Sequence, residues 1–575
     1  MTTENNKLAS IFHEIASMYK FMGGQSFRAG AYEKVSNSVL ELPERISKYV
    51  HENRVDEIPG VGESTKHDIV EYTKTGHVSR FDQLKKKIPY GLIELMDISG
   101  FGPASLNLLF KKLHITDRAE LMTALQDGRV AGLKGFGPRK VENMLRGLKL
   151  HKRIEERMLL WDAMQEAERL VKWLTQFPEV KRVEVAGSIR RRKETIGDID
   201  LVAIVNKKDR SKVASYFTDK SVCRKILVKG ETRISILTRN LGRQADLRMI
   251  NESEWGSALL YFTGSREHTI HLRAIAKSSG YKINEYGIFD SSEDMYWAGE
   301  TEQDMYKALG MQFIPPEMRE DRGEIELALK KRIPELVELK DIRGDLHVHS
   351  NWSDGSNAID EIAACVMKNY PYDYIAITDH SKSSRIAGGL NEKEFLKQIK
   401  VIRKVNEDLG KDYLKAGAEV DIRPDGSLDL SDELLAQLDW VIASIHSGFK
   451  KDNTERLIRA CESKYVHCIG HPTGRIIGRR DPYSVDLRAF IKAAYDTKTA
   501  LEINCQRDRM DMNDEMAWEV REKGIKIVIS TDSHKFSDLN WMQLGVGIAR
   551  RAWCKKENIL NTLSWKAVQK YFASP

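Results

Sequence analysis

The sequence is poor in cysteine and has no long apolar run. Its six cysteines are scattered along the chain, and no two of them form a CxxC pair. A disulfide framework and a zinc ribbon are therefore not expected, whereas a reducing compartment is. No apolar stretch approaches the ~18–20 residues that cross a bilayer. Glu14, Lys20 and Gly23 interrupt residues 1–30, where a signal peptide would lie. We therefore expect no association with a membrane.

The chain is too long for a single hydrophobic core. Its 575 residues, 41% hydrophobic and 30% charged, fit roughly three to five globular domains. Positive charge is concentrated in the N-terminal part: the net charge is +13 for residues 1–250, −6 for 251–340 and zero for 341–575. A basic surface there suits phosphate backbones, although an ordinary solvated lysine-rich surface explains the charge equally well.

One short pattern occurs three times in the N-terminal part. An apolar residue, any residue, Gly, an apolar residue and Gly follow one another at 58–62, 98–102 and 133–137. The glycines allow a tight turn between two helices, and backbone N–H groups of the second helix can then face a phosphate. The pattern resembles the helix-hairpin-helix element, which contacts DNA backbones without reading sequence. The predicted DNA contacts are Gly60, Gly62, Gly100, Gly102, Gly135 and Gly137.

Strand-like segments rich in β-branched residues follow between residues 183 and 250. Gly187 and Ser188 come directly after the first of them, where the backbone can approach a triphosphate. Arg190 and Arg191 add planar, permanently charged donors for phosphate oxygens. The segment therefore predicts a phosphate-binding turn.

Three aspartates predict a metal site beside this turn. Asp198 and Asp200 are two residues apart at the start of a strand, so both carboxylates face one side. Two like charges so close repel one another unless a cation lies between them, and a hard divalent ion such as Mg²⁺ takes oxygen ligands of this kind. Asp246 on a neighbouring strand would complete a two-metal site.

From residue 343 onward, short apolar strands alternate with helical stretches, which indicates an α/β barrel or a layered sheet. Six of the 15 histidines of the chain and three carboxylates lie at the ends of these strands, which would converge at one mouth of a barrel. Such ligands suit Zn²⁺, Mn²⁺ or Fe²⁺, and nine of them imply a cluster of two or three ions able to clamp a phosphate oxygen. The nine are His347, His349, Asp354, His380, Glu419, His446, His471, Asp532 and His534.

The first motif set resembles the family X DNA polymerases. The resemblance covers roughly residues 1–310 and is carried by GSIRR and GDID within 187–200, DLRMI at 246–250, YFTGS at 261–265 and NEY at 284–286. It implies that Asp198, Asp200 and Asp246 hold two Mg²⁺ or Mn²⁺ ions, one for the primer 3′-OH and one for the dNTP phosphates. The residues that it implies in dNTP binding or beside it are Gly187, Ser188, Arg191, Gly197, Tyr261, Phe262, Gly264 and Arg273.

The sequence also departs from that family. Asp68 stands where polymerase beta has a lysine that forms a Schiff base with an abasic sugar. A carboxylate cannot be that nucleophile, so deoxyribose-phosphate lyase activity of this type is in doubt. Thr269 stands where the family has an asparagine that contacts a base. Arg28, Tyr32 and Lys34 still resemble a pocket for a 5′-phosphate, although an amphipathic helix explains them nearly as well.

The second motif set resembles the PHP (polymerase and histidinol phosphatase) domain, an irregular (β/α)₇ barrel. DLHVHSNWSDG, ITDHS, AEVDIRPDG, SIHSGF, GHPTGR, EINCQRDRMD and STDSH cover nearly all of 340–575. The resemblance implies a 3′→5′ exonuclease that favours Mn²⁺, with abasic-site endonuclease or 3′-phosphatase activity in some members. Three arginines in these loops are candidates to hold substrate phosphates: Arg423, Arg475 and Arg509.

These resemblances imply a multidomain chain of α+β and α/β class: helical hairpin domains, a polymerase beta-like nucleotidyltransferase palm and a C-terminal (β/α)₇ PHP barrel. We expect an 8-kDa-like helical domain at 1–80, a fingers-like helical domain at 81–152, a palm at 153–250, a thumb-like domain at 251–316, a linker at 317–340 and the PHP domain at 341–575.

The expected function is a DNA-directed DNA polymerase that fills short gaps in base excision repair, with a PHP-domain 3′→5′ exonuclease. Its partners would be gapped or primer-template DNA and dNTPs. We expect a monomer in the bacterial cytosol or nucleoid. One alternative is a non-templated, RNA or small-molecule nucleotidyltransferase whose PHP domain is a phosphatase. Another is a non-catalytic DNA-binding scaffold, although no residue is missing from either ligand set.

Overall fold

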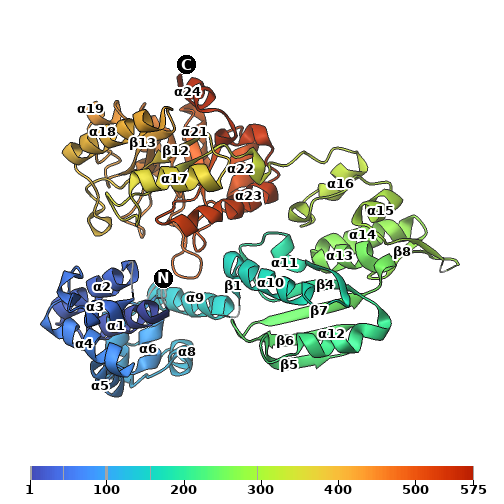
Figure 1. The fold of residues 1–575 in the computed structure, drawn as a ribbon, viewed down its shortest axis with the longest axis horizontal. Helices are drawn as coiled ribbons and strands as arrows, with labels where there is room; N and C mark the ends of the chain where they lie inside the picture. The colour runs from blue at the N-terminus through green and yellow to red at the C-terminus, as the bar shows by residue number, and fades with distance from the viewer. Residues whose placement is uncertain (1–2, 43–44, 98–100, 156, 294, 574–575) are drawn as a thin grey trace. The chain divides into compact units, whose positions relative to one another are not determined.

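The computed structural model describes residues 3–42, 45–97, 101–155, 157–293 and 295–573 (Figure 1). They form two compact units, essentially residues 3–155 and residues 157–573. Gly100, one of the predicted DNA contacts, lies outside the described residues. None of the described helices is both long enough and apolar enough to cross a membrane.

The described residues of the first unit form helices and turns. One hydrophobic cluster runs from Leu8 to Leu148, so the boundary predicted at 80/81 does not separate two cores. The α-helices are α1 (Thr3–Met22), α2 (Ser26–Glu41), α3 (Ile46–His51), α4 (Glu63–Thr75), α5 (Ser79–Lys87), α6 (Tyr90–Ile93), α7 (Pro103–Leu113), α8 (Arg118–Gln126) and α9 (Pro138–Glu155), with short 3₁₀ turns at Val55–Glu57 and Glu94–Asp97.

Each of the three glycine patterns leads into a helix, as the sequence predicts. Gly62 directly precedes α4, Gly102 precedes α7 and Gly137 precedes α9. Gly60 and Gly135 have φ angles of +85° and +90°, in the left-handed region that favours glycine. The first turn of each helix therefore presents backbone N–H groups next to a tight turn, although α7 and α9 begin with proline, which has no N–H.

The region predicted as the palm, which is called the palm below, contains a five-stranded sheet in the order β2-β4-β7-β6-β5. The central pair, β4 and β7, is parallel and the other pairs are antiparallel. Every residue of β4 is buried except Asp200, which is partly exposed and is paired with Asp246 of β7. The elements are β1 (Met158–Leu159), α10 (Leu160–Thr175), β2 (Val180–Val185), α11 (Gly187–Arg190), β3 (Thr195–Ile196), β4 (Ile199–Val205), α12 (Arg210–Phe217), β5 (Cys223–Lys229), β6 (Arg233–Thr238) and β7 (Gln244–Ile250).

The region after the palm combines helices with a small three-stranded antiparallel sheet, β10-β9-β8. Its elements are α13 (Trp255–Thr263), α14 (Arg266–Ser278), β8 (Tyr281–Asn284), β9 (Gly287–Asp290), β10 (Tyr296–Ala298), α15 (Glu302–Ala308) and α16 (Glu324–Leu329).

Residues 317–340, predicted as a linker, are packed into the fold instead. Arg319 and Glu324 are both fully buried. Arg319 donates to Glu302 at 2.6 Å, and Glu324 lies 2.7 Å from Nδ1 of His268. Two charged residues of this segment, Arg319 and Glu324, thus make buried polar contacts, which a sequence does not distinguish from surface charges.

The C-terminal region is the predicted (β/α)₇ barrel. Its seven strands are all parallel and follow chain order. A bridge between Val348 and Ser533 brings the first and last strands together, so the sheet is nearly closed. Figure 1 shows its helices around the strands. The strands are β11 (Gly344–Val348), β12 (Tyr374–Ile377), β13 (Leu414–Asp421), β14 (Trp440–Ser444), β15 (Cys468–Ile469), β16 (Ala500–Asn504) and β17 (Ile527–Ser530). The helices are α17 (Ile359–Asn369), α18 (Glu392–Leu409), α19 (Asp432–Leu435), α20 (Thr454–Glu462), α21 (Leu487–Asp496), α22 (Asp514–Glu522), α23 (Met542–Arg551) and α24 (Trp565–Ala573).

A buried ion triad ties the palm to the region that follows it. The Glu302 carboxylate accepts from Arg190 at 2.8 and 2.7 Å and from Arg319 at 2.6 Å. Burial acts to raise the pKa of Glu302, but Arg319 and Arg190 outweigh it and lower the pKa to about 2. Because the folded pKa lies below the unfolded value of 4.5, the triad stabilises the fold above pH 4.5 and loses that contribution as the pH falls towards 2.

We predict that Glu302→Gln lowers the free energy of unfolding by about 3 kcal/mol near neutral pH, because Arg319 then lacks its counter-ion. The loss should shrink as the pH falls from 4.5 towards 2, where the wild type loses the same contribution. Urea denaturation at neutral and acidic pH measures it. Glu300→Gln, at an exposed carboxylate nearby, is the control and should change neither value. A deficit independent of pH would contradict the assignment.

Candidate active sites

Three aspartates lie at one end of the central palm strands. Asp200 and Asp246 are paired across β4 and β7, and Asp198 directly precedes β4. Burial, then Asp198 and Asp246, raise the pKa of Asp200 to about 7, while Arg191 and Arg248 oppose the rise. Burial and Asp246 also raise the pKa of Asp198. The carboxylates therefore repel one another, as expected of ligands that share a cation.

Asp246 is held by two side chains that the sequence did not single out. Arg233 Nη2 donates to its Oδ2 at 2.7 Å, and Gln244 Nε2 donates to its Oδ1 at 3.1 Å. The trio is not among the described groups of three or more ligand residues whose donor atoms all lie within 4.8 Å of one another. All three ligands offer carboxylate oxygens, which fit a hard divalent cation. A cation at this site would compete with Arg233 for Asp246.

Gly187 forms a turn that no other residue could form at this place. Its φ is +59°, and a Cβ would lie 2.0 Å from Asp200 Oδ2. The N–H of Ala186 donates to the Asp200 carbonyl at 2.8 Å, which holds the turn against β4. Ser188 follows in the single turn of α11. The glycine thus lets the backbone pass close to Asp200, and the predicted approach to a triphosphate stays a prediction.

Two further predicted glycines border arginine side chains. A Cβ on Gly197 would lie 3.3 Å from Arg157 Nη1, and a Cβ on Gly264 would lie 3.3 Å from Arg191 Nη1. Gly264 also has a φ of +64°. Both positions leave room for a guanidinium close to the backbone.

Arg190 and Arg191, both predicted to bind phosphate, differ in the structure. The Arg190 guanidinium is engaged by Glu302 and by Thr263 Oγ1 at 2.8 Å. It is therefore a structural residue, and a phosphate role for it does not agree with this arrangement. Arg191 donates from Nη1 to the Thr263 carbonyl and from Nε to Glu320 at 3.1 Å. It stays close enough to the aspartates to act on their ionisation.

The aromatic pair of the YFTGS motif lies beside this turn. The Tyr261 and Phe262 rings are 5.1 Å apart with their planes at 79°. The Arg273 guanidinium lies 5.0 Å from the Tyr261 ring, and that of Arg248 lies 4.7 Å from the Phe262 ring. Arg248, two residues after Asp246 on β7, was not among the predicted residues. Two separate segments of sequence thus meet at the palm aspartates.

The nine predicted ligands of the barrel lie in or just after its strands, at their carboxyl ends. Glu419 is central and only 1% exposed. Its oxygens lie 3.4 Å from His347, 3.6 Å from His349, 2.9 Å from His380, 3.4 Å from His446 and 2.9 Å from His471. Burial acts to raise the pKa of Glu419, but the neighbouring histidines hold it well below its usual value.

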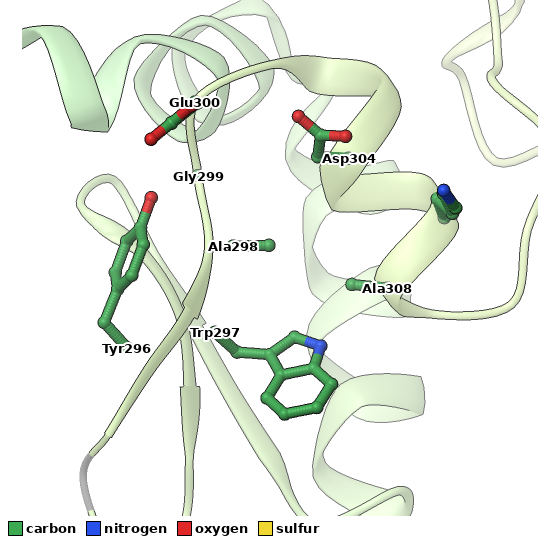
Figure 2. Close-up of a pocket in the computed structure, with 8 residues that line it drawn as sticks. Tyr296, Trp297, Ala298, Gly299, Glu300, Asp304 and Ala308 are labelled. Carbon is green, nitrogen blue, oxygen red and sulfur yellow. The ribbon is translucent and has the colours of Figure 1, made fainter.

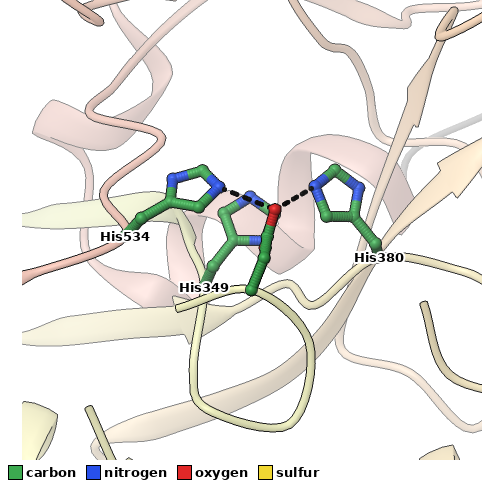
Figure 3. A group of neighbouring side chains, drawn as sticks. His349, His380 and His534 are labelled. Atoms are coloured by element: carbon green, nitrogen blue, oxygen red, sulfur yellow. Dashed lines mark ion pairs between the residues drawn. The ribbon is translucent and has the colours of Figure 1, made fainter. Parts of the chain in front are cut away.

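Eight of the nine fall into three overlapping groups within which the donor atoms lie within 4.8 Å of one another. The groups are His349, Asp354, His380 and His534; His347, His349 and Asp532; and His380, Glu419 and His446. Figure 3 shows the three imidazoles of the first group around the Asp354 carboxylate. Asp354 Oδ2 lies 3.3 Å from His534 Nε2 and 3.5 Å from His380 Nε2. His471 belongs to none of the groups and contacts Glu419.

The donor set fits divalent transition metals. Five buried nitrogen atoms have no hydrogen-bond partner: Nε2 of His347, both ring nitrogens of His349, Nδ1 of His380 and Nδ1 of His471. Buried polar atoms are rarely left without a partner, so orphaned imidazole nitrogens beside carboxylates are typical of metal ligands. The first group shares His349 with the second and His380 with the third, so the three groups form one continuous cluster of side chains.

Two further carboxylates orient the histidines, and the sequence reading missed both. Glu502, fully buried in β16, lies 2.7 Å from His347 Nδ1. Asp421, the last residue of β13, lies 2.6 Å from His446 Nδ1. Each pairing directs the other nitrogen, Nε2, towards Glu419. Asp421 is two residues after Glu419, so strand alternation could have placed it on the same face.

The three loop arginines are engaged within the fold. Arg423 pairs with Asp429 at 2.9 Å, Arg475 pairs with Glu194 at 2.7 Å, and Arg509 donates to Gln506 at 2.9 Å. Arg475 is nearly buried. Its partner belongs to the palm, so it joins the barrel to the palm.

One surface hollow is separate from both sites. It measures about 490 Å³ and is lined by Tyr296, Trp297, Glu300, Asp304 and Lys307, among others (Figure 2). None of the predicted site residues lines it. Its mixed charges favour no particular ligand, so we assign it no role.

In the first unit, Asp68 is a structural residue. It is 1% exposed and accepts from the Tyr32 hydroxyl at 2.5 Å and from Arg80 Nε at 2.9 Å. Tyr32 is likewise buried, whereas Arg28 is exposed. The Lys34 side chain packs against Gly60, where a Cβ would meet it at 2.7 Å. Phosphate contacts by Arg28, Tyr32 and Lys34 stay predictions.

Comparisons with known proteins agree with this arrangement. The helix-hairpin-helix domain family matches residues 3–78, the DNA polymerase beta thumb family matches 258–320 and the PHP domain family matches 345–504. The chain is 35% identical over 566 residues to the DNA polymerase/3′-5′ exonuclease PolX of Bacillus subtilis, covering 98% of each protein. It is 25% identical over 347 residues to DNA polymerase lambda of Rattus norvegicus, covering 56% of this chain and 57% of that one. A probable phosphatase of Caldicellulosiruptor bescii is 32% identical over 176 residues, 29% of this chain and 68% of that protein.

We predict that Gly187→Ala abolishes nucleotide incorporation, because its Cβ would collide with Asp200 Oδ2 in a backbone conformation that alanine rarely adopts. Hydrolysis of DNA 3′ ends should stay within about twofold of wild type, since the barrel is untouched. Gly132→Ala, where a Cβ meets only an ordinary contact at 3.7 Å, is the control. Primer extension at wild-type rate by Gly187→Ala would refute the geometry.

We predict that Glu502→Gln weakens metal binding in the barrel about 10- to 100-fold, because His347 loses the carboxylate that fixes its ring orientation. Titration with Mn²⁺ or Zn²⁺, followed by calorimetry, measures the affinity. Glu433→Gln, at an exposed carboxylate of the same barrel, should bind as the wild type does. Unchanged affinity in Glu502→Gln would show that this contact does not orient the ligand.

Proposed function

The chain belongs to the family X DNA polymerases that carry a C-terminal PHP domain, and from this premise we propose how its residues divide the work of a DNA polymerase and 3′→5′ exonuclease. The polymerase site is the palm trio with the turn that begins at Gly187. The exonuclease site is the nine-ligand cluster of the barrel. The observation that carries this proposal is that two chemically distinct ligand sets, one all-carboxylate and one rich in imidazole, occupy two different folds.

At the palm, Asp198, Asp200 and Asp246 would hold two Mg²⁺ or Mn²⁺ ions, which supply activation of the primer 3′-OH and neutralisation of phosphate charge. The backbone at Gly187 and Ser188 approaches the triphosphate, and Arg191 offers it a charged donor. Gly197 and Gly264 leave room beside it. Tyr261 and Phe262 lie against the sugar of the incoming dNTP, and Arg273 borders this pair on the template side.

At the barrel, the nine ligands would hold two or three ions of Mn²⁺, Zn²⁺ or Fe²⁺, which supply Lewis acidity for phosphodiester hydrolysis. Glu502 and Asp421 orient His347 and His446, so that the nitrogen facing Glu419 is the unprotonated one. The similarity of part of this chain to a probable phosphatase makes 3′-phosphate and abasic ends additional candidate substrates.

We further propose that the enzyme fills short gaps in DNA during base excision repair. The glycine turns before α4, α7 and α9 would bind the phosphate backbone, in keeping with the basic charge of residues 1–250. Removal of an abasic sugar by a Schiff-base lysine is not expected, because Asp68 is locked between Tyr32 and Arg80. A monomer in the bacterial cytosol remains our expectation.

Non-templated nucleotide transfer, the alternative function, is not favoured, because the relatives of this chain include a DNA polymerase/3′-5′ exonuclease over 98% of its length and DNA polymerase lambda over 56% of it. Incorporation on a primer with and without a template strand separates the two. Equal rates in both reactions would overturn templated synthesis.

We predict that Asp200→Ala abolishes primer extension and leaves 3′→5′ hydrolysis within about twofold, and that His349→Ala does the reverse, because each residue serves one ligand set. A labelled gapped duplex with Mn²⁺, with and without dNTPs, measures both activities. The same duplex with a 3′-phosphate tests the additional substrate.

The controls are Asp209→Asn and His467→Gln, which change the same residue types outside both sites. Both controls should retain both activities. Loss of both activities in Asp200→Ala or in His349→Ala, with melting temperatures unchanged, would contradict two separate sites.

A further inference from the structure

Helix α23 of the barrel packs against the phosphate-binding turn of the palm. Gly547 faces Arg192, where a Cβ would lie 3.1 Å from the arginine Cβ. Arg192 has a φ of +56°, in the left-handed region that a bulky side chain seldom adopts. This strained residue directly follows Arg191. A conformation of this kind persists only where its surroundings hold it in place.

Arg551, the last residue of α23, supplies that support. Its side chain is almost fully buried. Nη1 donates to the Arg191 carbonyl at 2.8 Å and to Glu320 Oε1 at 2.8 Å, and Nη2 donates to Asp514 at 2.9 Å. One guanidinium from the exonuclease domain thus binds the palm backbone, a thumb-side carboxylate and its own domain at the same time.

Glu320 transmits this contact to the side chain of Arg191. Its Oε1 accepts from Arg551 and also from Arg191 Nε at 3.1 Å. Burial acts to raise the pKa of Glu320, but Arg551 and Arg191 outweigh it and keep the carboxylate ionised. With Nε and Nη1 of Arg191 both engaged, the guanidinium has one fixed orientation beside the palm aspartates.

We infer that Arg551 is a positioning residue for the polymerase reaction: through the Arg191 backbone and through Glu320, the exonuclease domain fixes the arginine that receives the dNTP triphosphate. The inference rests on the proposed role of Arg191. A pre-oriented guanidinium binds its anion with less loss of conformational freedom, so the contact acts on nucleotide affinity. The nucleotide pocket of the polymerase is therefore completed by Arg551, which lies 360 positions after Arg191 and in another domain.

The neighbouring arginine offers a matched control. Arg550 lies on the same helix and also crosses to the thumb side, donating to Glu317 at 2.8 Å and to the Val337 carbonyl at 3.0 Å. The hydrogen-bond partners of its side chain among the described residues are Glu317 and Val337, and neither Arg191 nor Glu320 is one of them. Arg550→Met therefore removes a cross-domain ion pair of the same kind without altering the path to Arg191.

The test is single-turnover incorporation on a gapped duplex with Mg²⁺, titrated with one dNTP, which gives an apparent Kd and a maximal rate. Arg551→Met should raise the Kd roughly 5- to 20-fold and change the maximal rate by less than about threefold. Arg551→Lys, which keeps one donor, should recover part of the affinity. Glu320→Gln should act in the same direction, and the double variant should fall short of additivity because both lie on one path. Hydrolysis of 3′ ends should stay within about twofold in all of them.

The outcomes separate the inference from the proposal on which it rests. If Arg191→Met leaves the Kd unchanged, Arg191 does not bind the triphosphate, and the proposed function is wrong at this residue. If Arg191→Met raises the Kd but Arg551→Met behaves like Arg550→Met, the positioning role is wrong. Equal loss of synthesis and hydrolysis in Arg551→Met would mean that the residue only stabilises the fold, and would overturn the inference. Should Arg551→Met fail to fold, Arg551→Lys and Glu320→Gln decide the matter by the same Kd.

Discussion

Titratable groups crowded into partly or fully buried surroundings are the constraint on which both catalytic regions depend. In the palm, burial and the neighbouring aspartates raise the pKa of Asp198 and of Asp200. Arg157 and Arg233 oppose the rise at Asp198, and Arg191 and Arg248 oppose it at Asp200. In the barrel, a single buried carboxylate, Glu419, stands among five imidazoles. Each of these two arrangements is held by the strands around it, whose buried β-branched residues provide the packing that such groups cannot.

The fold provides this rigidity in two different ways. In the palm, the only parallel pair of strands places two aspartates side by side, while a glycine turn and an arginine approach from the next element. In the barrel, the ligands come from the ends of successive parallel strands. Further carboxylates, such as Glu502, contact the Nδ1 atoms of the histidines and fix the orientation of their rings. Sites of the first kind suit a substrate that brings phosphates and needs room. Sites of the second kind suit metals that stay in place between reactions.

Strand ends, glycine turns and alternating ligands could be predicted from the sequence, because each depends on residues close together in the chain. Examples are GDID, the pair His347 and His349, and the turns before α4, α7 and α9. The barrel and its seven strands followed from the same alternation. What could not be read was set by partners distant in the chain. Arg190 is a residue type that often binds phosphate, but here it pairs with Glu302. Residues 317–340 have the composition of a linker, but they contribute the buried Arg319 and Glu324. Arg551 and Glu320 belong to no recognisable sequence motif, because their contacts with Arg191 depend on how α23 packs against the palm.

The near-closure of the barrel has a consequence for the synthesis of the chain on the ribosome. Its first strand carries His347 and the residues after its last strand carry Asp532, and the two belong to one ligand group. A ribosome must therefore finish almost the entire chain before that group can exist, whereas the palm strands are complete much earlier. Any truncated product that ends within the barrel would hold all three palm aspartates but an unfinished hydrolytic centre. The ligand cluster of the barrel is therefore complete only after residue 534 has been added, long after the three palm aspartates.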